Sequence, residues 1–103
     1  MIFEFEDIGF KFGLYASAIT EKEAGRPISE VVGEMGKGHI LPILQYFYGA
    51  AAAYNESKGK PKITMSDVSD AIEKIGLVKI MNVLQETLQM PKNSEAPKET
   101  GQP

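Results

Sequence analysis

The residues with the greatest potential for chemistry are His39, which is the only histidine, and the Gly36-Lys37-Gly38 run before it. Backbone N–H groups at a glycine-rich helix start can bind a phosphate. A P-loop requires Gly-x-x-x-x-Gly-Lys-Ser/Thr, whereas Val31 occupies the first glycine position here and Gly38 the hydroxyl position. We therefore predict that residues 36–39 form a flexible loop and a helix start, rather than a nucleotide site.

Acidic residues gather near the N-terminus and again at Glu21 and Glu23, and such carboxylates can bind a metal ion or transfer protons. The first group consists of Glu4, Glu6 and Asp7. Neither group has calcium-loop spacing, the chain has no cysteine, and a single imidazole gives no recognisable triad. We interpret both groups as solvated faces. The sequence thus predicts no enzyme, and no catalytic, cofactor-binding or metal-binding residues.

Length and charge narrow the classes of partner. The chain has 103 residues, 43% of them hydrophobic, and a formal net charge of −3. This length fits one domain with a modest core, and the charge gives no attraction to phosphate backbones or anionic lipid. A helix-turn-helix reading of the last two helices fails because the second carries only Lys79 against Glu86. Without a membrane-length apolar run or a signal-peptide start, we expect a cytoplasmic protein that binds neither nucleic acid nor membranes.

The N-terminal residues Ile2 to Phe12 alternate between apolar and polar types on either side of Asp7-Ile8-Gly9. This alternation predicts a short β-hairpin, with a single strand leading into the first helix as the alternative. An isolated hairpin is marginally stable in water, so its aromatic face needs helices or a partner to lie against. The aromatic residues are Phe3, Phe5, Phe10 and Phe12.

Helical spacing predicts four to five helices after the hairpin. The first covers about residues 13–24, with Gly25 as a left-handed cap. The next is short and poorly helical, because glycines interrupt it, and we expect a mobile connection here with Ser29 as the cap. The strongest helix runs from about Ile40 to Ser57. The residues at helical spacing are Leu14, Tyr15, Ala18, Ile19 and Lys22 in the first helix, and the short helix carries Val31, Val32 and Met35.

Two more helices follow a basic loop at residues 58–62. One begins near Thr64 or Ser66, either of which can cap it. The last helix has an apolar stripe at positions i, i+3, i+4, i+7 and i+11. This stripe is Leu77, Ile80, Met81, Leu84 and Leu88. Val78 and Val83 lie off the stripe, and each either packs internally or marks a contact surface.

Residues 91–103 contain no large apolar side chain and cannot repay the entropy lost on ordering. We therefore predict a helical domain at residues 1–90 and a disordered tail at residues 91–103. The predicted fold is mainly α, a small bundle of four to five helices with a short N-terminal β-hairpin and a disordered C-terminal tail.

Several segments, in their order and spacing, resemble the short tail assembly chaperones of long-tailed bacteriophages and related gene transfer agents. They are the run Phe10-Lys11-Phe12-Gly13-Leu14, the first helix end at Glu21 to Ile28, the Leu44 to Tyr54 helix with its Tyr-Gly-Ala-Ala-Ala-Ala-Tyr pattern, and the helix start at Ile63 to Ile72. The resemblance covers about Phe3 to Leu88.

The resemblance implies a non-enzymatic helical protein that coats the tape measure protein, keeps it soluble and recruits tail tube subunits. It also implies a location in the cytoplasm of the infected or lysogenic bacterial host, and absence from the mature virion. Many genes of this family yield a longer product by ribosomal frameshifting. Pro91-Lys92-Asn93 can be encoded as CCA-AAA-AAC, which contains a slippery heptamer. A structural tail or head-tail connector subunit is the alternative, and a small enzyme or DNA-binding regulator ranks third.

A chaperone for a long amphipathic client needs an apolar groove that makes weak, repeated contacts. The last-helix stripe either packs internally, which we favour, or receives a client helix. Self-association into a homo-oligomer is also open. The predicted partner-binding residues are Phe3, Phe5, Phe10, Phe12, Tyr46, Tyr54, Val78 and Val83.

Overall fold

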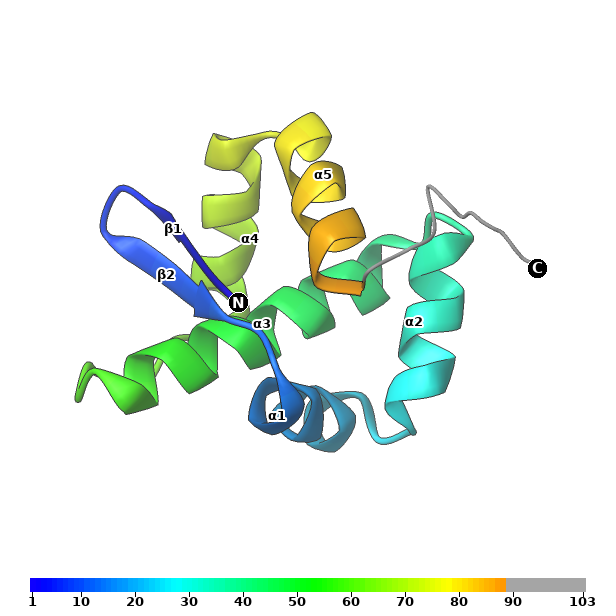
Figure 1. The fold of residues 1–103 in the computed structure, drawn as a ribbon, viewed down its shortest axis with the longest axis horizontal. Helices are drawn as coiled ribbons and strands as arrows, with labels where there is room; N and C mark the ends of the chain where they lie inside the picture. The colour runs from blue at the N-terminus through cyan, green and yellow to red at the C-terminus, as the bar shows by residue number, and fades with distance from the viewer. Residues whose placement is uncertain (89–103) are drawn as a thin grey trace.

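The computed structural model of the chain describes residues 1–88, and Figure 1 shows its arrangement. Within these residues the fold is mainly helical with an N-terminal hairpin, as predicted. The predicted domain limit at residue 90 and the predicted disordered tail at 91–103 lie outside the described residues. The elements in chain order are β1 (Ile2–Phe5), β2 (Ile8–Lys11), α1 (Leu14–Ala24), α2 (Ile28–Gly36), α3 (Ile40–Ser57), α4 (Met65–Ile75) and α5 (Leu77–Leu88).

The two strands form an antiparallel hairpin, so the alternative of a single strand is wrong. Phe3 pairs with Phe10, and Phe5 pairs with Ile8. The turn is therefore made by Glu6 and Asp7 and not by the expected Asp7-Ile8-Gly9, and Glu6 has a positive φ of 55°. Because paired residues lie on the same face of a sheet and alternate residues of a strand share a face, the register places Phe3, Phe5 and Phe10 on one face of the hairpin.

Helix α3 is the centre of the molecule, and its bounds are those predicted from its apolar residues. Pro42 lies in its first turn, where a missing N–H is tolerated. Figure 1 shows α3 running through the molecule, with the hairpin, α1, α2, α4 and α5 arranged around it. Phe47, near its middle, is fully buried.

Helix α1 comes closest to α3 through the small residues Ala16 and Thr20, and Ile19 is half-buried against the core. Thr20 is fully buried, and its Oγ1 donates to the Ala16 carbonyl (3.0 Å) or to the Gln45 carbonyl of α3 (3.3 Å). Gly49 of α3 lies against this point, because a Cβ there would overlap Thr20 Oγ1 and the Ala16 carbonyl.

The close contact determines which face of α1 is buried. Leu14 is 91% exposed and Tyr15 is 57% exposed, so the first two apolar residues of the α1 spacing pattern lie at the surface. The predicted left-handed cap is confirmed, since Gly25 has a φ of 72° and donates its N–H to the Glu21 carbonyl. Backbone proximity has thus prevailed over the burial of large side chains in orienting α1.

Helix α2 forms across Gly33 and buries Val31 and Met35, which corrects the expectation of a poorly helical segment. Its N-cap residue is Pro27, not Ser29. The Glu21 carboxylate of α1 accepts the Ile28 N–H at 2.7 Å, and so a side chain from another helix satisfies this N-terminus. The predicted mobility of the connection stays a prediction.

Helix α4 begins with a complete capping box, in which Thr64 and Asp67 exchange side-chain and backbone hydrogen bonds at 3.1 Å. Thr64 is therefore the cap, one of the two candidates. On α5 the buried residues are Ile80, Val83 and Leu84, whereas Leu77 is 57% exposed and Met81 is 40% exposed. The predicted α5 stripe is thus correct at Ile80 and Leu84 and wrong at Leu77 and Met81.

The α1–α3 contact gives a prediction about Gly49. The substitution Gly49→Ala should lower the free energy of unfolding by about 3 kcal/mol, because the new methyl group overlaps α1 backbone and the buried Thr20. Urea unfolding followed by circular dichroism measures this loss. The matched control is Gly33→Ala, since a Cβ at Gly33 meets no atom within 4 Å and alanine favours the helix by about 1 kcal/mol. Equal effects of the two substitutions would contradict the proposed contact.

Candidate functional site

The aromatic residues of the hairpin that were expected to contact a partner lie mostly in the core. Phe10 is 0% exposed and Phe12 is 6% exposed. Both rings meet Phe47 of α3 edge-on, with ring centroids 5.4 and 5.3 Å apart. Phe3 and Phe5 are half-buried, and the Phe3 ring stacks on the Phe10 ring with centroids 5.9 Å apart. The hairpin therefore uses its aromatic face to bind α3, and the expectation of an accessible aromatic surface is corrected for Phe10 and Phe12.

Three more predicted partner residues are interior, which corrects their assignment to a free surface. Tyr46, Tyr54 and Val83 are each less than 10% exposed. The Tyr46 hydroxyl donates to Thr87 Oγ1 of α5 at 3.2 Å, and the Tyr54 hydroxyl donates to Glu4 of β1 at 2.5 Å. Of the predicted contact residues, Val78 alone is well exposed, at 80%.

An apolar groove lies between the first turns of α3 and the corner where α4 meets α5. Its volume is about 370 Å³. Four apolar side chains from the three helices line it, together with Ser69, Glu73 and Gly76. These apolar residues are Ile40, Leu44, Ile72 and Leu77.

The apolar character extends beyond the groove along both helices. Leu41 is 58% exposed, Val78 is 80% exposed and Met81 is 40% exposed. Leu41 lies one helical turn before Leu44 on α3, and Met81 lies one helical turn after Leu77 and Val78 on α5. We name the set of seven the α3–α5 apolar surface: Ile40, Leu41, Leu44, Ile72, Leu77, Val78 and Met81.

Val78 was predicted from the sequence to contact a partner, whereas Ile40 and Leu41 were not. The signal was present, because α3 is apolar around most of its circumference from its first residue onward. A helix start of this type at the end of a small domain has few neighbours available to cover it.

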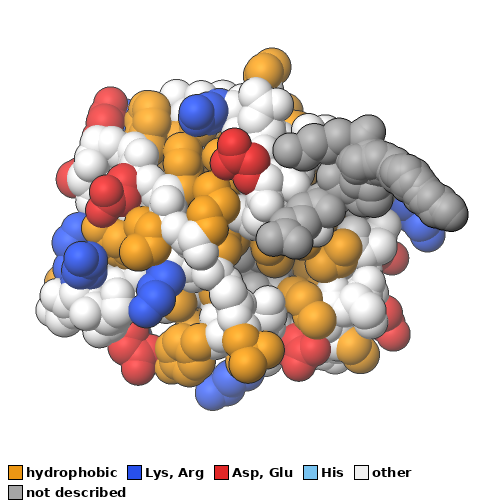
Figure 2. All heavy atoms as spheres, in the orientation of Figure 1, with side chains coloured by type: hydrophobic (Ala, Val, Ile, Leu, Met, Phe, Trp, Pro, Cys, Tyr) orange, Lys and Arg blue, Asp and Glu red, His pale blue; other side chains and the backbone are white. Residues whose placement is uncertain are grey.

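Figure 2 shows one face of the molecule, where hydrophobic side chains also lie between charged groups over the hairpin.

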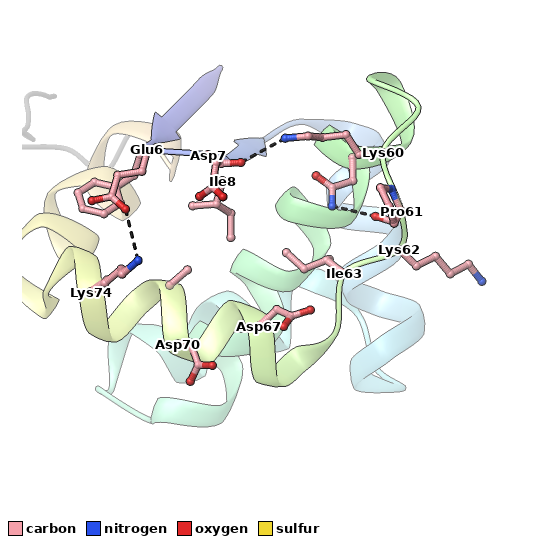
Figure 3. Close-up of a pocket in the computed structure, with 13 residues that line it drawn as sticks. Glu6, Asp7, Ile8, Lys60, Pro61, Lys62, Ile63, Asp67, Asp70 and Lys74 are labelled. Atoms are coloured by element: carbon pink, nitrogen blue, oxygen red, sulfur yellow. Dashed lines mark hydrogen bonds and ion pairs between the residues drawn. The ribbon is translucent and has the colours of Figure 1, made fainter.

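A second hollow, of about 430 Å³, lies between the hairpin turn, the loop before α4 and α4 itself (Figure 3). Its charged groups mainly attach the hairpin turn to the helices. Lys74 Nζ lies 3.4 Å from Glu6 Oε1, and Lys60 Nζ donates to the Asp7 carbonyl at 3.2 Å. Asp67, on the same wall, serves the capping box. Because Glu6, Lys60, Asp67 and Lys74 already have structural partners, this polar cleft is the weaker candidate.

His39 and the Gly36-Lys37-Gly38 run, the residues with potential for chemistry, connect and begin helices. His39 is the N-cap residue of α3, and Lys37 and Gly38 join α2 to α3, as predicted, whereas Gly36 is the last residue of α2 and does not belong to the predicted loop. In residues 1–88 no three histidine, aspartate or glutamate side chains are grouped as metal ligands would be. No helix in the same part of the chain combines the length and the apolar character that a membrane span needs.

Comparison of the chain with protein-family models, with curated proteins and with solved structures gave no match. The assignment of the candidate site therefore rests on the geometry of this chain alone.

The tyrosines give a pH prediction. A hydrogen bond to Glu4, burial and the nearby charge raise the pKa of Tyr54, and a hydrogen bond to Glu56 raises the pKa of Tyr15 above 10.0. Burial raises the pKa of Tyr46, against a smaller lowering effect of Thr87. Since the unfolded chain releases these protons near pH 10.0 and the folded chain holds them, stability should be full below pH 10.0 and fall above it.

Glu4→Gln should lower the pKa of Tyr54 toward 10.0, because the phenolate would no longer face a carboxylate. NMR titration of labelled tyrosine rings measures it. Glu56→Gln is the matched control, which should shift Tyr15 and leave Tyr54 unchanged. An unchanged Tyr54 titration in Glu4→Gln would show that the hydrogen bond does not control this group.

Proposed function

We propose that this chain is a bacteriophage tail assembly chaperone, which binds the tape measure protein and helps to recruit tail tube subunits during tail morphogenesis. The observation that carries the proposal is the α3–α5 apolar surface. Ile40, Leu77 and Val78 are each more than half exposed on a small helical domain. An open apolar surface of this kind marks a site for protein binding more often than a site for catalysis.

The segments that carry the family resemblance also support the proposal, because they occupy key positions in the fold. Phe10 to Leu14 leads the hairpin into α1, and the Tyr48 to Tyr54 run contains Gly49, where α1 crosses α3. The segment from Ile63 to Ile72 contains the capping box of α4. A shared pattern at these positions is what a shared fold requires.

The shape of the surface suits the proposed client. A tape measure protein is long and helical, so its chaperone must make similar contacts at many places. A shallow groove of about 370 Å³ that spans three helices accepts an apolar stripe without demanding one particular side chain. Weak binding at each place is then sufficient, because many copies share one client.

The proposal places the protein in the cytoplasm of the infected or lysogenic host and outside the finished virion. The alternative, a structural tail or head-tail connector subunit, keeps the same surface but buries it permanently against a neighbouring subunit. Purified particles separate the two functions. Stoichiometric amounts of this chain in virions would favour the connector, whereas its absence there agrees with the chaperone.

Co-expression tests the proposed function. We expect the long helical protein encoded beside this chain to become more soluble, and to be recovered in complex with it, because the apolar stripes of the client would be covered. Centrifugation of lysates followed by affinity recovery measures both effects. An unrelated acidic helical protein of similar size is the control. Solubility that is unchanged by this chain would contradict the chaperone function.

A further inference from the structure

We propose that the α3–α5 apolar surface holds a single amphipathic helix of the client, with a lysine or arginine beside that helix's apolar stripe placed against Glu73. This inference rests on the proposed function and assigns it a location. It names the residues that bind and the charge that the partner must carry.

The apolar part of the inference follows from where the exposed side chains lie. Ile40 is the first residue of α3 and Leu77 is the first residue of α5, and the groove between them has Leu44 and Ile72 as further lining. An incoming helix presents residues at i, i+3, i+4 and i+7 along one side. Two neighbouring side chains of such a stripe can enter the groove, while a third covers Val78, which is 80% exposed.

The charge of the partner follows from the groove itself. Glu73 is the only charged residue that lines it in the described part of the chain. Lys74, next along α4, is held by Glu6 of the hairpin turn at 3.4 Å. Within residues 1–88 no cation lies at ion-pair distance from Glu73. A lysine of the partner can lay its methylene stem on the apolar surface and bring its ammonium group to this carboxylate.

Two other occupants fit less well. Residues 91–103 of this chain have no large apolar side chain that could cover Ile40 or Leu77. A second copy in a two-fold contact would bring the same patch from each side. Each copy would then bring Glu73 as the only charged lining residue of its groove, so neither groove would supply a cation to pair with the other.

A pair of synthetic peptides tests the inference. Each has roughly 20 residues, a length that gives a helix useful stability, and a leucine stripe at i, i+3, i+4 and i+7. One carries lysines beside the stripe and the other carries glutamates. Binding to the full chain is measured by fluorescence anisotropy. We expect the lysine peptide to bind more tightly, with a preference that decreases as salt is added. Equal binding of the two peptides, or tighter binding of the glutamate peptide, would overturn the charge assignment.

The location is tested with matched leucine variants. Leu77 and Leu14 are each the first residue of a helix and are both exposed, at 57% and 91%, but only Leu77 lines the groove. Leu77→Ser should weaken binding of the lysine peptide by about tenfold or more, and Leu14→Ser should leave it unchanged. Val78→Ser adds a second variant whose side chain contributes little to the core. Glu73→Lys should reverse the preference between the peptides.

Different results would contradict the proposed surface and the proposed function. If Leu77→Ser and Val78→Ser bind the lysine peptide as well as Leu14→Ser does, the proposed surface is wrong. If the variants only dissociate a dimer, as sedimentation would show, the occupant is a second copy and the inference is also wrong. Failure of the wild-type chain to solubilise its co-expressed client would instead overturn the proposed function.

Discussion

The close approach of α1 to α3 at Gly49 is the constraint on which the rest of the molecule depends. Only a glycine lets the Ala16 and Thr20 turn of α1 reach the α3 backbone, and Thr20 satisfies its hydroxyl there with helix carbonyls. This contact sets the rotation of α1. It also brings the α1 end to the place where Glu21 accepts the first N–H of α2, so that one crossing positions three helices.

The hairpin is attached to α3 by the same kind of constraint. The Tyr54 ring lies so close to Gly9 of β2 that a Cβ there would overlap it, and the Tyr54 hydroxyl reaches Glu4 on the paired strand. The aromatic face of the hairpin then meets Phe47 edge-on. Glycine at the two contact points is therefore as important to the fold as the aromatic core, because it permits the distances at which that core packs.

Local signals were sufficient to predict most elements, whereas the buried faces depended on contacts that the sequence does not display. The alternation of apolar and polar residues predicted the hairpin, Gly25 predicted the end of α1, and the apolar run of α3 predicted its bounds. The helical spacing of α1 did not indicate which of its faces is buried, because Gly49 and Thr20 are distant in sequence. Val83 was assigned to a surface because the α5 stripe was counted from Leu77, and tertiary packing selected Ile80, Val83 and Leu84. The aromatic face of the hairpin had to pack against another part of the protein, but the sequence pattern did not indicate that this part is α3.

The exposed first turns of α3 and α5 follow from this arrangement. The hairpin and α1 take the middle of α3, and α5 turns Ile80, Val83 and Leu84 inward, so that Ile40 and Leu77 remain open. Full burial of one such side chain contributes about 1.5–3 kcal/mol. A partner that half-covers a few of them gains only a weak affinity at each contact, after the cost of association. Under the proposed function this weakness is useful, because many copies on one long client hold it together and each can still be displaced when tube subunits arrive.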